Sequence, residues 1–278
     1  MNEMKNICIT LIVPFYNESQ RWNRIYWDEL LGIPYLNWIL INDGSTDGTK
    51  KLLESLANKN HVRVLSLSEN LGKSEAIRHG LKHALDRIDL NQEINNMNLI
   101  GYMDGDGAFI KDDIERISKI SLEKVSQNKS QDGKASSNVV DAVWSSRVAL
   151  RGRQISREKY RHYLGRIVVT FLNHFVPEMP YDSQCGFKIF LNTKGLERCV
   201  HVPFETKWFI DIEIMLRWNH FMKNRINIWE EPLDTWREIP GSKLNLRSTI
   251  TVLRDIFAIM VMRNKLKSTN SRIHYFAA

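Results

Sequence analysis

Short apolar runs alternate with polar, helix-like segments through the first half of the chain. The apolar runs have the length of a strand and are rich in β-branched and aromatic residues; they are 7–13, 36–42, 61–67 and 99–104. Apolar positions at helical spacing follow two of these runs, over 50–59 and 75–88. Because Pro14 cannot donate to a ladder, we expect the first strand to stop there. Strand, loop and helix in repetition predict an α/β fold with a mainly parallel sheet.

The second half of the chain has denser aromatic and arginine residues. A polar run at 126–138 predicts a surface loop, and 139–146 predicts a further strand. Residues 156–176 and 246–267 each carry a broad apolar stripe at helical spacing, with arginines or lysines beside it. Such a helix either packs on the core with a solvated basic face or lies in a membrane interface. The pattern leaves both interpretations open.

No internal repeat or long linker divides the chain. We therefore expect a single domain over 1–245, followed by an amphipathic helix and tail over 246–278. No stretch approaches the roughly 20 apolar residues of a membrane span. The N-terminus lacks the pattern of a signal peptide, so a cytoplasmic protein is expected.

The composition narrows the class of protein and of partner. Hydrophobic residues make up 43% and charged residues 26%, which is typical of a folded soluble protein. Three cysteines, Cys8, Cys185 and Cys199, lack metal-binding spacing and are expected to be reduced. The net charge of +7 favours an anionic partner, which is a nucleic acid, a lipid headgroup or a phosphorylated substrate.

Two aspartates follow the strand that begins at Leu99. Asp104 and Asp106 are separated by Gly105, and side chains two apart on an extended chain point the same way. Carboxylates so placed can share Mg²⁺ or Mn²⁺, which would neutralise a diphosphate. Alternatively, Asp106 caps the helix predicted at 112–117. The motif alone does not choose between a metal site and a cap.

Polar residues also follow the other predicted strands. Tyr16 can stack on a flat base, and Glu18 can accept hydrogen bonds from a base or ribose. Asp43 begins a turn that resembles a calcium loop, but a strand precedes it where an entering helix is required. Gly72-Lys73-Ser74 lacks the first glycine of a phosphate-binding P-loop, because Leu67 stands there; Lys73 can still reach a phosphate.

Several sequence segments occur together in an order that is specific to one family. They are 14–18, 42–47, 70–73, 104–106, 146–147, 157–161, 182–190, 208–213 and 236–244. This set resembles the inverting family 2 glycosyltransferases of the GT-A fold. More narrowly it resembles dolichyl-phosphate β-glucosyltransferases and their bacterial polyprenyl-phosphate relatives. The chain departs from that pattern at Gly105 and Phe109, where the relatives have Ala and Thr.

The resemblance implies a role for individual residues. It places nucleotide-sugar and metal binding in 7–125 and the acceptor and catalytic part in 139–245. The nucleotide sugar would contact Pro14, Tyr16, Glu18, Asp43, Ser45, Lys73, Asp104, Gly105, Ser242 and Lys243. Asp104 and Asp106 would hold Mg²⁺ or Mn²⁺. Catalytic residues would be Asp182, Gln184, Asp211 and Glu213, and the acceptor phosphate would meet Arg147, Arg157 and Arg161.

The implied activity is a metal-dependent, inverting transfer of a hexose to a polyprenyl phosphate, dolichyl or undecaprenyl. Glucose from UDP-glucose is the expected donor. The relatives' N-terminal anchor has no counterpart here, so contact with an anionic membrane surface is expected to be peripheral, on the cytoplasmic face. One alternative is transfer to a soluble, capsule or cell-wall glycan. A basic nucleic-acid-binding protein is disfavoured, because the arginines lie beside aliphatic residues and no nucleic-acid motif occurs.

Overall fold

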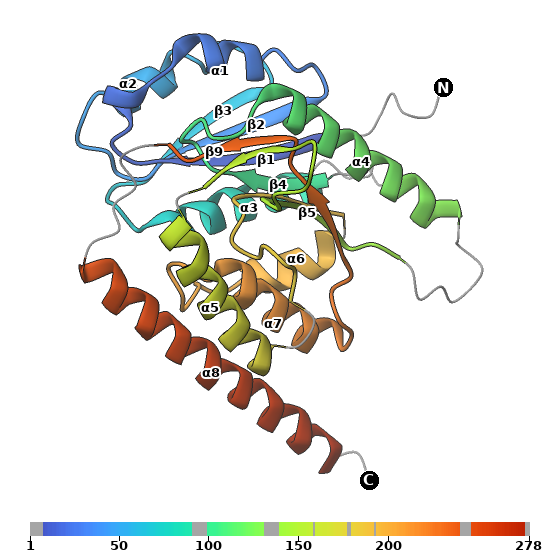
Figure 1. Cartoon of the computed structure of the whole chain (residues 1–278). Helices are drawn as coiled ribbons and strands as arrows, with labels where there is room; N and C mark the ends of the chain where they lie inside the picture. The colour runs from blue at the N-terminus through green and yellow to red at the C-terminus, as the bar shows by residue number, and fades with distance from the viewer. Residues whose placement is uncertain are drawn as a thin grey trace.

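The structure, a computed structural model, describes residues 8–90, 99–130, 139–157, 159–176, 179–191, 193–239 and 246–275. Within these ranges the side chains at 88–90, 129–130, 159–164, 193, 246–249 and 267–275 are not described. A seven-stranded sheet in the order β3-β2-β1-β4-β7-β5-β8 forms the centre of this described part. Helices cover both faces of the sheet (Figure 1).

The strands predicted in the first half are present and parallel. They are β1 (Ile9–Phe15), β2 (Leu36–Asn42), β3 (Val62–Ser66) and β4 (Leu99–Met103). β1 lies between β2 and β4, and β2 pairs with β3. The expected stop at Pro14 is wrong, since β1 continues to Phe15. Pairing of β1 with β4 ends at Ile12, so the missing N–H of Pro14 breaks no bond on that side.

The second half completes the sheet with β5 (Ala142–Ser146), β7 (Phe187–Phe190) and β8 (Ile228–Pro232). β7 runs antiparallel between β4 and β5, and β5 pairs in parallel with β8. A separate small sheet joins β6 (Gln154–Ser156) to β9 (Thr235–Arg237) in parallel. The expectation of a mainly parallel α/β sheet is confirmed.

Alternate residues of the central strands enter two hydrophobic cores. Leu11 and Val13 face the core beneath α1 (Arg24–Leu30), α2 (Thr49–Glu54) and α4 (Lys111–Ser130). Ile12 faces the opposite core, which contacts α3 (Lys73–Leu90), α6 (Thr193–Val200) and α7 (Ile210–Met222). Burial on both faces explains why these strands read as continuous apolar runs. A short 3₁₀ helix, η2 (Ser19–Arg21), follows β1.

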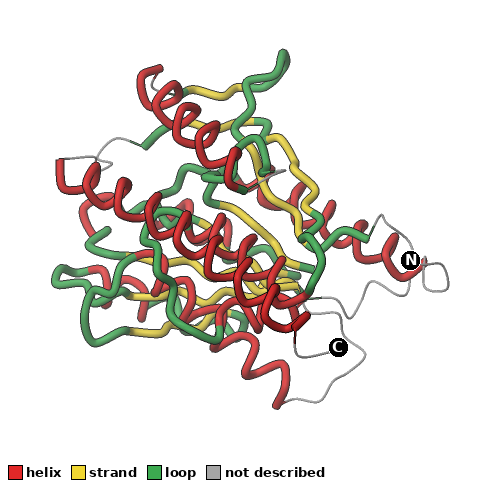
Figure 2. Tube along the Cα trace, turned by 90° about the horizontal axis from the view of Figure 1, so that it is seen from below, coloured by secondary structure: helices red, strands yellow, loops and turns green. Residues whose placement is uncertain are grey.

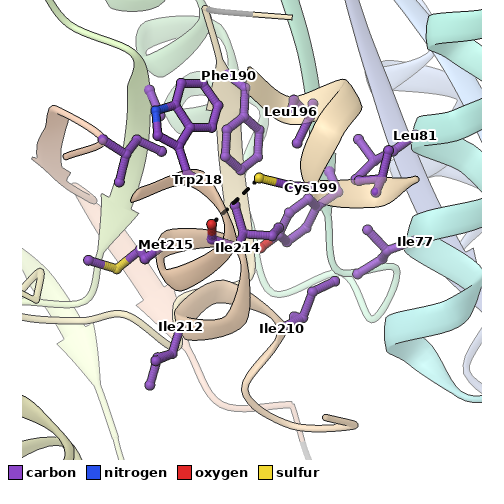
Figure 3. Close-up of a cluster of buried hydrophobic side chains, with 14 of the residues drawn as sticks. Ile77, Leu81, Phe190, Leu196, Cys199, Ile210, Ile212, Ile214, Met215 and Trp218 are labelled. Atoms are coloured by element: carbon purple, nitrogen blue, oxygen red, sulfur yellow. Dashed lines mark hydrogen bonds between the residues drawn. The ribbon is translucent and has the colours of Figure 1, made fainter. Parts of the chain in front are cut away.

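Large side chains fill the core below the sheet (Figure 3). Trp218 of α7 lies among Phe190 of β7 and Leu196 of α6, and each of the three is fully buried. A Cβ at Gly195 would come within 2.4 Å of the Trp218 ring, so this glycine lets α6 pack directly on α7. The core fixes α7, whose first turn carries Asp211.

α4 is longer than the sequence predicted. Residues 126–130 are helical, so the expectation of a surface loop is wrong there, and 131–138 lie outside the described residues. Asn128 holds this last part of the helix, because its side chain donates to Val140 O at 2.8 Å and accepts from Val140 N at 3.1 Å.

Two amphipathic helices, α5 (Lys159–Phe175) and α8 (Leu246–Tyr275), lie side by side below the sheet in the view of Figure 1. Seen from below, helices lie across this face of the sheet (Figure 2). One face of α8 is buried at Asp255, Ile259 and Met262. Its opposite face exposes Ile250, Leu253 and Phe257, which we call the α8 apolar strip. Neither this helix nor any other in the described residues is apolar over enough of its length to cross a membrane.

Candidate active site

The loops after β1, β2 and β4 meet at one edge of the sheet, because the carboxyl ends of parallel strands lie together. They enclose a cavity of about 430 Å³, which we call the first cavity. It is lined by Pro14, Phe15, Tyr16, Glu18, Arg21, Asp43, Asn70, Gly72, Lys73, Asp104, Gly105, Asp106, Trp208 and Ile239. Segments from both halves of the chain therefore build this cavity.

Asp104 and Asp106 lie at the floor of the site, directly after β4. The Lys73 ammonium lies 2.5 Å from Asp104 Oδ1. Desolvation acts to lower the pKa of Lys73, but the charge and hydrogen bond of Asp104, together with the charges of Asp211 and Asp106, raise that pKa overall. Asp106 accepts from the Ala108 N–H at 3.0 Å, and α4 begins only at Lys111, so Asp106 closes a turn rather than capping that helix.

Gly186 has no side chain, and the Asp104 carboxylate occupies the space that a side chain would need. The Asp104 N–H donates to Gly186 O at 2.9 Å, which brings β4 and the start of β7 together. A Cβ at Gly186 would lie 2.2 Å from Asp104 Oδ2. Any side chain at this position would therefore displace the carboxylate from the cavity.

Asp43 lines the first cavity and also organises its wall. Its buried carboxylate accepts from the N–H groups of Leu71 and Gly72 at 2.8 and 2.9 Å, and from Asn70 Nδ2 at 3.0 Å. Desolvation raises the pKa of Asp43 even though these bonds oppose it. Asp43 thus holds the 70–72 loop, which leads into Lys73.

The other residues predicted for the nucleotide differ in position. Tyr16 and Glu18 line the first cavity, and Glu18 pairs with Arg21 at 2.5 Å. Pro14 and Gly105 pack against each other in its wall; a Cβ at Gly105 would lie 2.8 Å from Pro14 O. Ser45 does not line the cavity, and its hydroxyl accepts from the Asn17 N–H at 3.1 Å.

A second cavity of about 300 Å³ adjoins the first. Both are lined by Lys73, Asp104, Asp106, Trp208 and Ile239. The second cavity adds Tyr102, Arg147, Arg157, Gln184, Gly186, Lys207, Ile210, Asp211, Trp236 and Glu238. The two aspartates therefore stand where one cavity opens into the other.

Two arginines of the second cavity are anchored by a single carboxylate. Arg147 Nε and Nη2 each lie 2.7 Å from Asp182, one on each oxygen, and the Arg147 N–H donates to Asp182 Oδ2 at 2.9 Å. Arg157 Nη1 lies 3.7 Å from the same Oδ2. Asp182 is buried, and the arginines hold its pKa at about 2 although desolvation opposes them. Asp182 does not line the second cavity, and its described contacts serve to position the arginines.

Arg157 is the less neutralised of the two cations. Burial and the neighbouring charge of Arg147 lower the pKa of its guanidinium. Burial also acts to lower the pKa of Arg147, but the charge and hydrogen bonds of Asp182, together with weaker charges nearby, raise that pKa overall. An anion in the second cavity would relieve the repulsion between the two guanidinium groups.

Asp211 faces the second cavity from the first turn of α7. Its Oδ1 accepts from the Tyr102 hydroxyl and lies 2.7 Å from Lys188 Nζ. Lys188 is fully buried in β7 and also donates to Cys185 O and Ser183 O, at 2.5 and 3.0 Å. The described bonds of Asp211 end on Oδ1, which leaves Oδ2 for a ligand.

Glu213 lies outside both cavities, although it is two residues from Asp211. Its fully buried carboxylate accepts from the N–H groups of Glu205 and Thr206, at 3.0 and 2.9 Å, and pairs with Arg217 at 2.5 Å. Gln184 does line the second cavity. Ser242 and Lys243 lie outside the described residues, as does the side chain of Arg161.

Sequence reasoning missed several residues that line or support the site. Trp208, 43% exposed, lines both cavities, while Lys207 and Trp236 line the second. Lys188 supports Asp211 from within the sheet. A lysine inside the apolar run 187–190 was a usable signal, because a buried lysine needs acceptors around it. Trp208 and Trp236 begin two of the segments that resemble the family, 208–213 and 236–244, whereas Lys207 carried no signal of this kind.

The donor set at Asp104 and Asp106 fits a divalent cation in part. Two carboxylates line the same cavities, and hard cations prefer such oxygen ligands. Desolvation, and then the charge of Asp104, raise the pKa of Asp106. A bound cation would offset the repulsion between the two carboxylates. The described residues hold no cluster of three or more His, Cys, Asp or Glu side chains suited to a metal. Two carboxylates leave coordination positions for a diphosphate and for water.

Comparison with known sequences finds one family model, described as "Glycosyl transferase family 2", that matches residues 10–170. The chain is 28% identical to the dolichyl-phosphate beta-glucosyltransferase of Dictyostelium discoideum, over 93% of this chain and 75% of that protein. It is 26% identical to the protein of the same name from Saccharomyces cerevisiae, over 92% and 75%.

Comparison with solved structures finds the same fold at lower sequence identity. A glucosyl-3-phosphoglycerate synthase of Mycobacterium tuberculosis, solved with Mn²⁺, UDP and its product, has a TM-score of 0.53 at 16% identity, over 92% of this chain and 79% of that one. A mannosyltransferase of Pyrobaculum calidifontis, solved with GDP-mannose and Mn²⁺, has a TM-score of 0.50 at 17% identity, over 91% and 64%. The fold is that of the GT-A glycosyltransferases.

Proposed function

The chain belongs to glycosyl transferase family 2, and from that premise we propose that it transfers glucose from UDP-glucose to a polyprenyl phosphate, with inversion and with a divalent cation. The observation that carries the proposal is the pair of adjoining cavities. One combines aspartates with an aromatic and polar wall, and the other presents two arginines anchored by Asp182.

The first cavity suits a nucleotide diphosphate sugar. Tyr16 offers a ring at its mouth for a base, and Glu18 and Asp43 offer carboxylate oxygens to base or ribose donors. Lys73, at the first position of α3, lies where a diphosphate would approach the aspartates. The relatives named as glucosyltransferases support glucose as the sugar.

The cation is assigned to Asp104 and Asp106 and is Mg²⁺ or Mn²⁺. When bound, it would act as a Lewis acid on the leaving diphosphate. Lys73 now pairs with Asp104, and the same ammonium can turn to a phosphate oxygen once a cation occupies the carboxylates. Two solved GT-A structures contain Mn²⁺, which supports a divalent metal in this fold.

The second cavity suits the phosphate of the acceptor. Arg157 Nη1 lies 3.7 Å from Asp182 Oδ2, which is an ion-pair distance but too long for a hydrogen bond. The guanidinium can therefore turn its N–H groups to a phosphate and bind two of its oxygens at once. Arg147 is held rigidly by two bonds to Asp182 and adds a fixed positive charge. Arg161 stays a prediction, as do Ser242 and Lys243 on the donor side.

In the reaction the acceptor phosphate oxygen attacks the anomeric carbon from the face opposite the leaving diphosphate. A phosphate is already ionised near neutral pH, so little help from a general base is needed. Asp211 Oδ2 accepts a hydrogen bond from a sugar hydroxyl, and Tyr102 and Lys188 fix its carboxylate in that orientation. Gln184, in the turn before β7, contacts the sugar from another part of the second cavity, and Asp182 positions both arginines.

We propose that the protein acts at the cytoplasmic face of a membrane and binds there peripherally through α5 and α8, because the proposed acceptor is a lipid phosphate. α5 exposes Ile167 and Phe171, and it lies against α8, which carries the α8 apolar strip. The net charge of +7 favours an anionic lipid surface. α5 begins at Lys159, so the helix starts close to Arg157 of the proposed phosphate site.

One observation favours a second candidate acceptor. A sugar hydroxyl, as in a soluble, capsule or cell-wall glycan, would need a general base, and Asp211 offers a carboxylate oxygen in the second cavity. The anchored arginines would then bind an anionic group elsewhere on the glycan. The two acceptors differ in their need for a general base, which only the sugar hydroxyl requires.

The test supplies UDP-glucose with either undecaprenyl phosphate or a soluble oligosaccharide. We expect transfer to the lipid phosphate, and Arg157→Lys should slow it about tenfold, because an ammonium cannot reproduce the guanidinium fork. Slow hydrolysis of UDP-glucose should be unchanged in the variant. Arg198→Lys, on α6 and remote from both cavities, is the matched control. Transfer to the oligosaccharide alone, or an unaffected rate in Arg157→Lys, would contradict the proposal.

A further inference from the structure

The loop at 204–208 is held in an unusual way. Its backbone N–H groups donate to side-chain carboxylates of three different helices rather than to backbone carbonyl groups. Phe204 donates to Glu75 of α3 at 2.8 Å, and Glu205 and Thr206 donate to Glu213 of α7. Lys207 and Trp208 donate to Asp255 Oδ2 of α8, at 2.7 and 2.8 Å.

This loop delivers two side chains to the proposed site. Trp208 lines both cavities, and Lys207 lines the second, in which Arg147 and Arg157 also lie. The Lys207 carbonyl also accepts from the Ser74 hydroxyl at 2.7 Å, next to Lys73. The position of the loop therefore sets where the Lys207 ammonium and the Trp208 indole meet the substrates.

Asp255 is a costly residue for α8 to bury. Asp255 is fully buried on the same face of α8 as Ile259, and its carboxylate meets the 204–208 loop. Among the described residues its Oδ1 accepts no hydrogen bond. Arg254 Nη2 lies 3.7 Å from that oxygen, at an ion-pair distance. A buried carboxylate lowers stability unless hydrogen bonds compensate its lost hydration. The two N–H groups of the loop provide that compensation, and an apolar residue would pack on the core without needing them.

We infer that Asp255 is a positioning residue for the transfer reaction: it places Lys207 and Trp208 at the acceptor cavity and makes α8 part of the active site. The inference rests on the proposed function for its catalytic consequence. The bonds themselves can be tested without it. Because the α8 apolar strip lies on the other side of the same helix, the segment proposed to meet lipid is bonded directly to the loop that meets the acceptor.

The test compares Asp255→Leu, Asp255→Asn and the control Asp141→Leu. Asp141 also has a buried carboxylate, which accepts from the Asn227 N–H at 2.8 Å, away from both cavities. Asp255→Leu should raise KM for undecaprenyl phosphate about tenfold or more, with a smaller change in KM for UDP-glucose. Asp255→Asn keeps an acceptor oxygen and should lie between wild type and Asp255→Leu. A purely structural loss would lower kcat through the amount of active protein and leave both KM values unchanged.

Hydrogen–deuterium exchange gives a readout that does not depend on activity. The amides of Lys207 and Trp208 should exchange about tenfold faster in Asp255→Leu, and at the wild-type rate in Asp141→Leu. Unchanged protection of these amides, or unchanged KM values in folded Asp255 variants, would overturn the inference. If the wild-type protein transfers no glucose, the proposed function fails, and the exchange rates still show whether Asp255 holds the 204–208 loop. If Asp255→Leu does not fold, the same measurements on Asp255→Asn decide the role of Asp255.

Discussion

Asp182 shows the difference between a carboxylate in a reaction and a carboxylate that holds other groups in place. Both of its oxygens accept from Arg147, and Arg157 lies 3.7 Å away. Its pKa of about 2 means that the ionised form is favoured by the fold. A group with so low a pKa is a poor proton acceptor near neutral pH.

The same pKa predicts a pH dependence of stability. The folded pKa lies below the ordinary value for aspartate, so the stabilisation is fully present above about pH 4 and is lost as the pH falls towards 2. Asp182→Asn should therefore lower the free energy of unfolding by about 2 kcal/mol at pH 7, and by roughly half as much at pH 3. Urea unfolding of both proteins at the two pH values measures this. A deficit that is equal at pH 3 and pH 7 would show that the charge of Asp182 is not its source.

Some of the site was predictable residue by residue, and some was not. Asp104 and Lys73 follow separate strands, and parallel topology brings such positions to one edge of the sheet. Asp211 and Glu213 were predicted together, yet residues two apart on a helix do not face the same way. α7 therefore turns Asp211 to the cavity and Glu213 to the 204–208 loop.

At the scale of single elements, α8 presents two different faces, and its sequence left open whether it packs on the core or lies in a membrane interface. One face packs on the core through Ile259 and Met262, and the other leaves the apolar strip exposed, with Phe257 67% accessible. The core-packing interpretation is therefore confirmed for one face, and the membrane interpretation stays a prediction for the other. The apolar stripe looked broad in the sequence because two surfaces contribute to it.

The exposed face predicts binding to lipid. Phe257→Asp should weaken sedimentation with anionic vesicles about tenfold or more, because it removes apolar burial and adds repulsion from the lipid phosphates. Phe257→Leu, which keeps an apolar side chain, is the control and should bind nearly as wild type does. Binding should also fall with added salt. Wild-type protein that stays in the supernatant at low salt would contradict a lipid-facing strip.

Element boundaries were predicted less well than the elements themselves. The helical end of α4 at 126–130 has no apolar spacing to reveal it, because Asn128 fixes it through bonds to Val140, which comes later in the chain. The antiparallel β7 has only four residues, too few for a period to be read. Both depend on contacts between distant segments, which local patterns do not contain.

At the scale of the molecule, the order of the apolar runs was enough to predict the sheet. Runs such as 36–42 are buried on both faces, and that burial requires helices above and below. The structure then adds what spacing could not indicate: two adjoining cavities share Asp104 and Asp106, and two arginines line the second of them. The central claim is that a divalent cation at these aspartates lets the donor in the first cavity react with the acceptor in the second.

The most direct test follows label from radiolabelled UDP-glucose into an organic extract that contains undecaprenyl phosphate. We predict lipid-linked label with Mg²⁺ or Mn²⁺, none in excess chelator, and a loss of about a hundredfold or more in Asp106→Asn. Asp112→Asn, at an exposed position of α4, should retain the wild-type rate. Equal lipid-linked label with and without chelator, or an unaffected Asp106→Asn, would contradict the account.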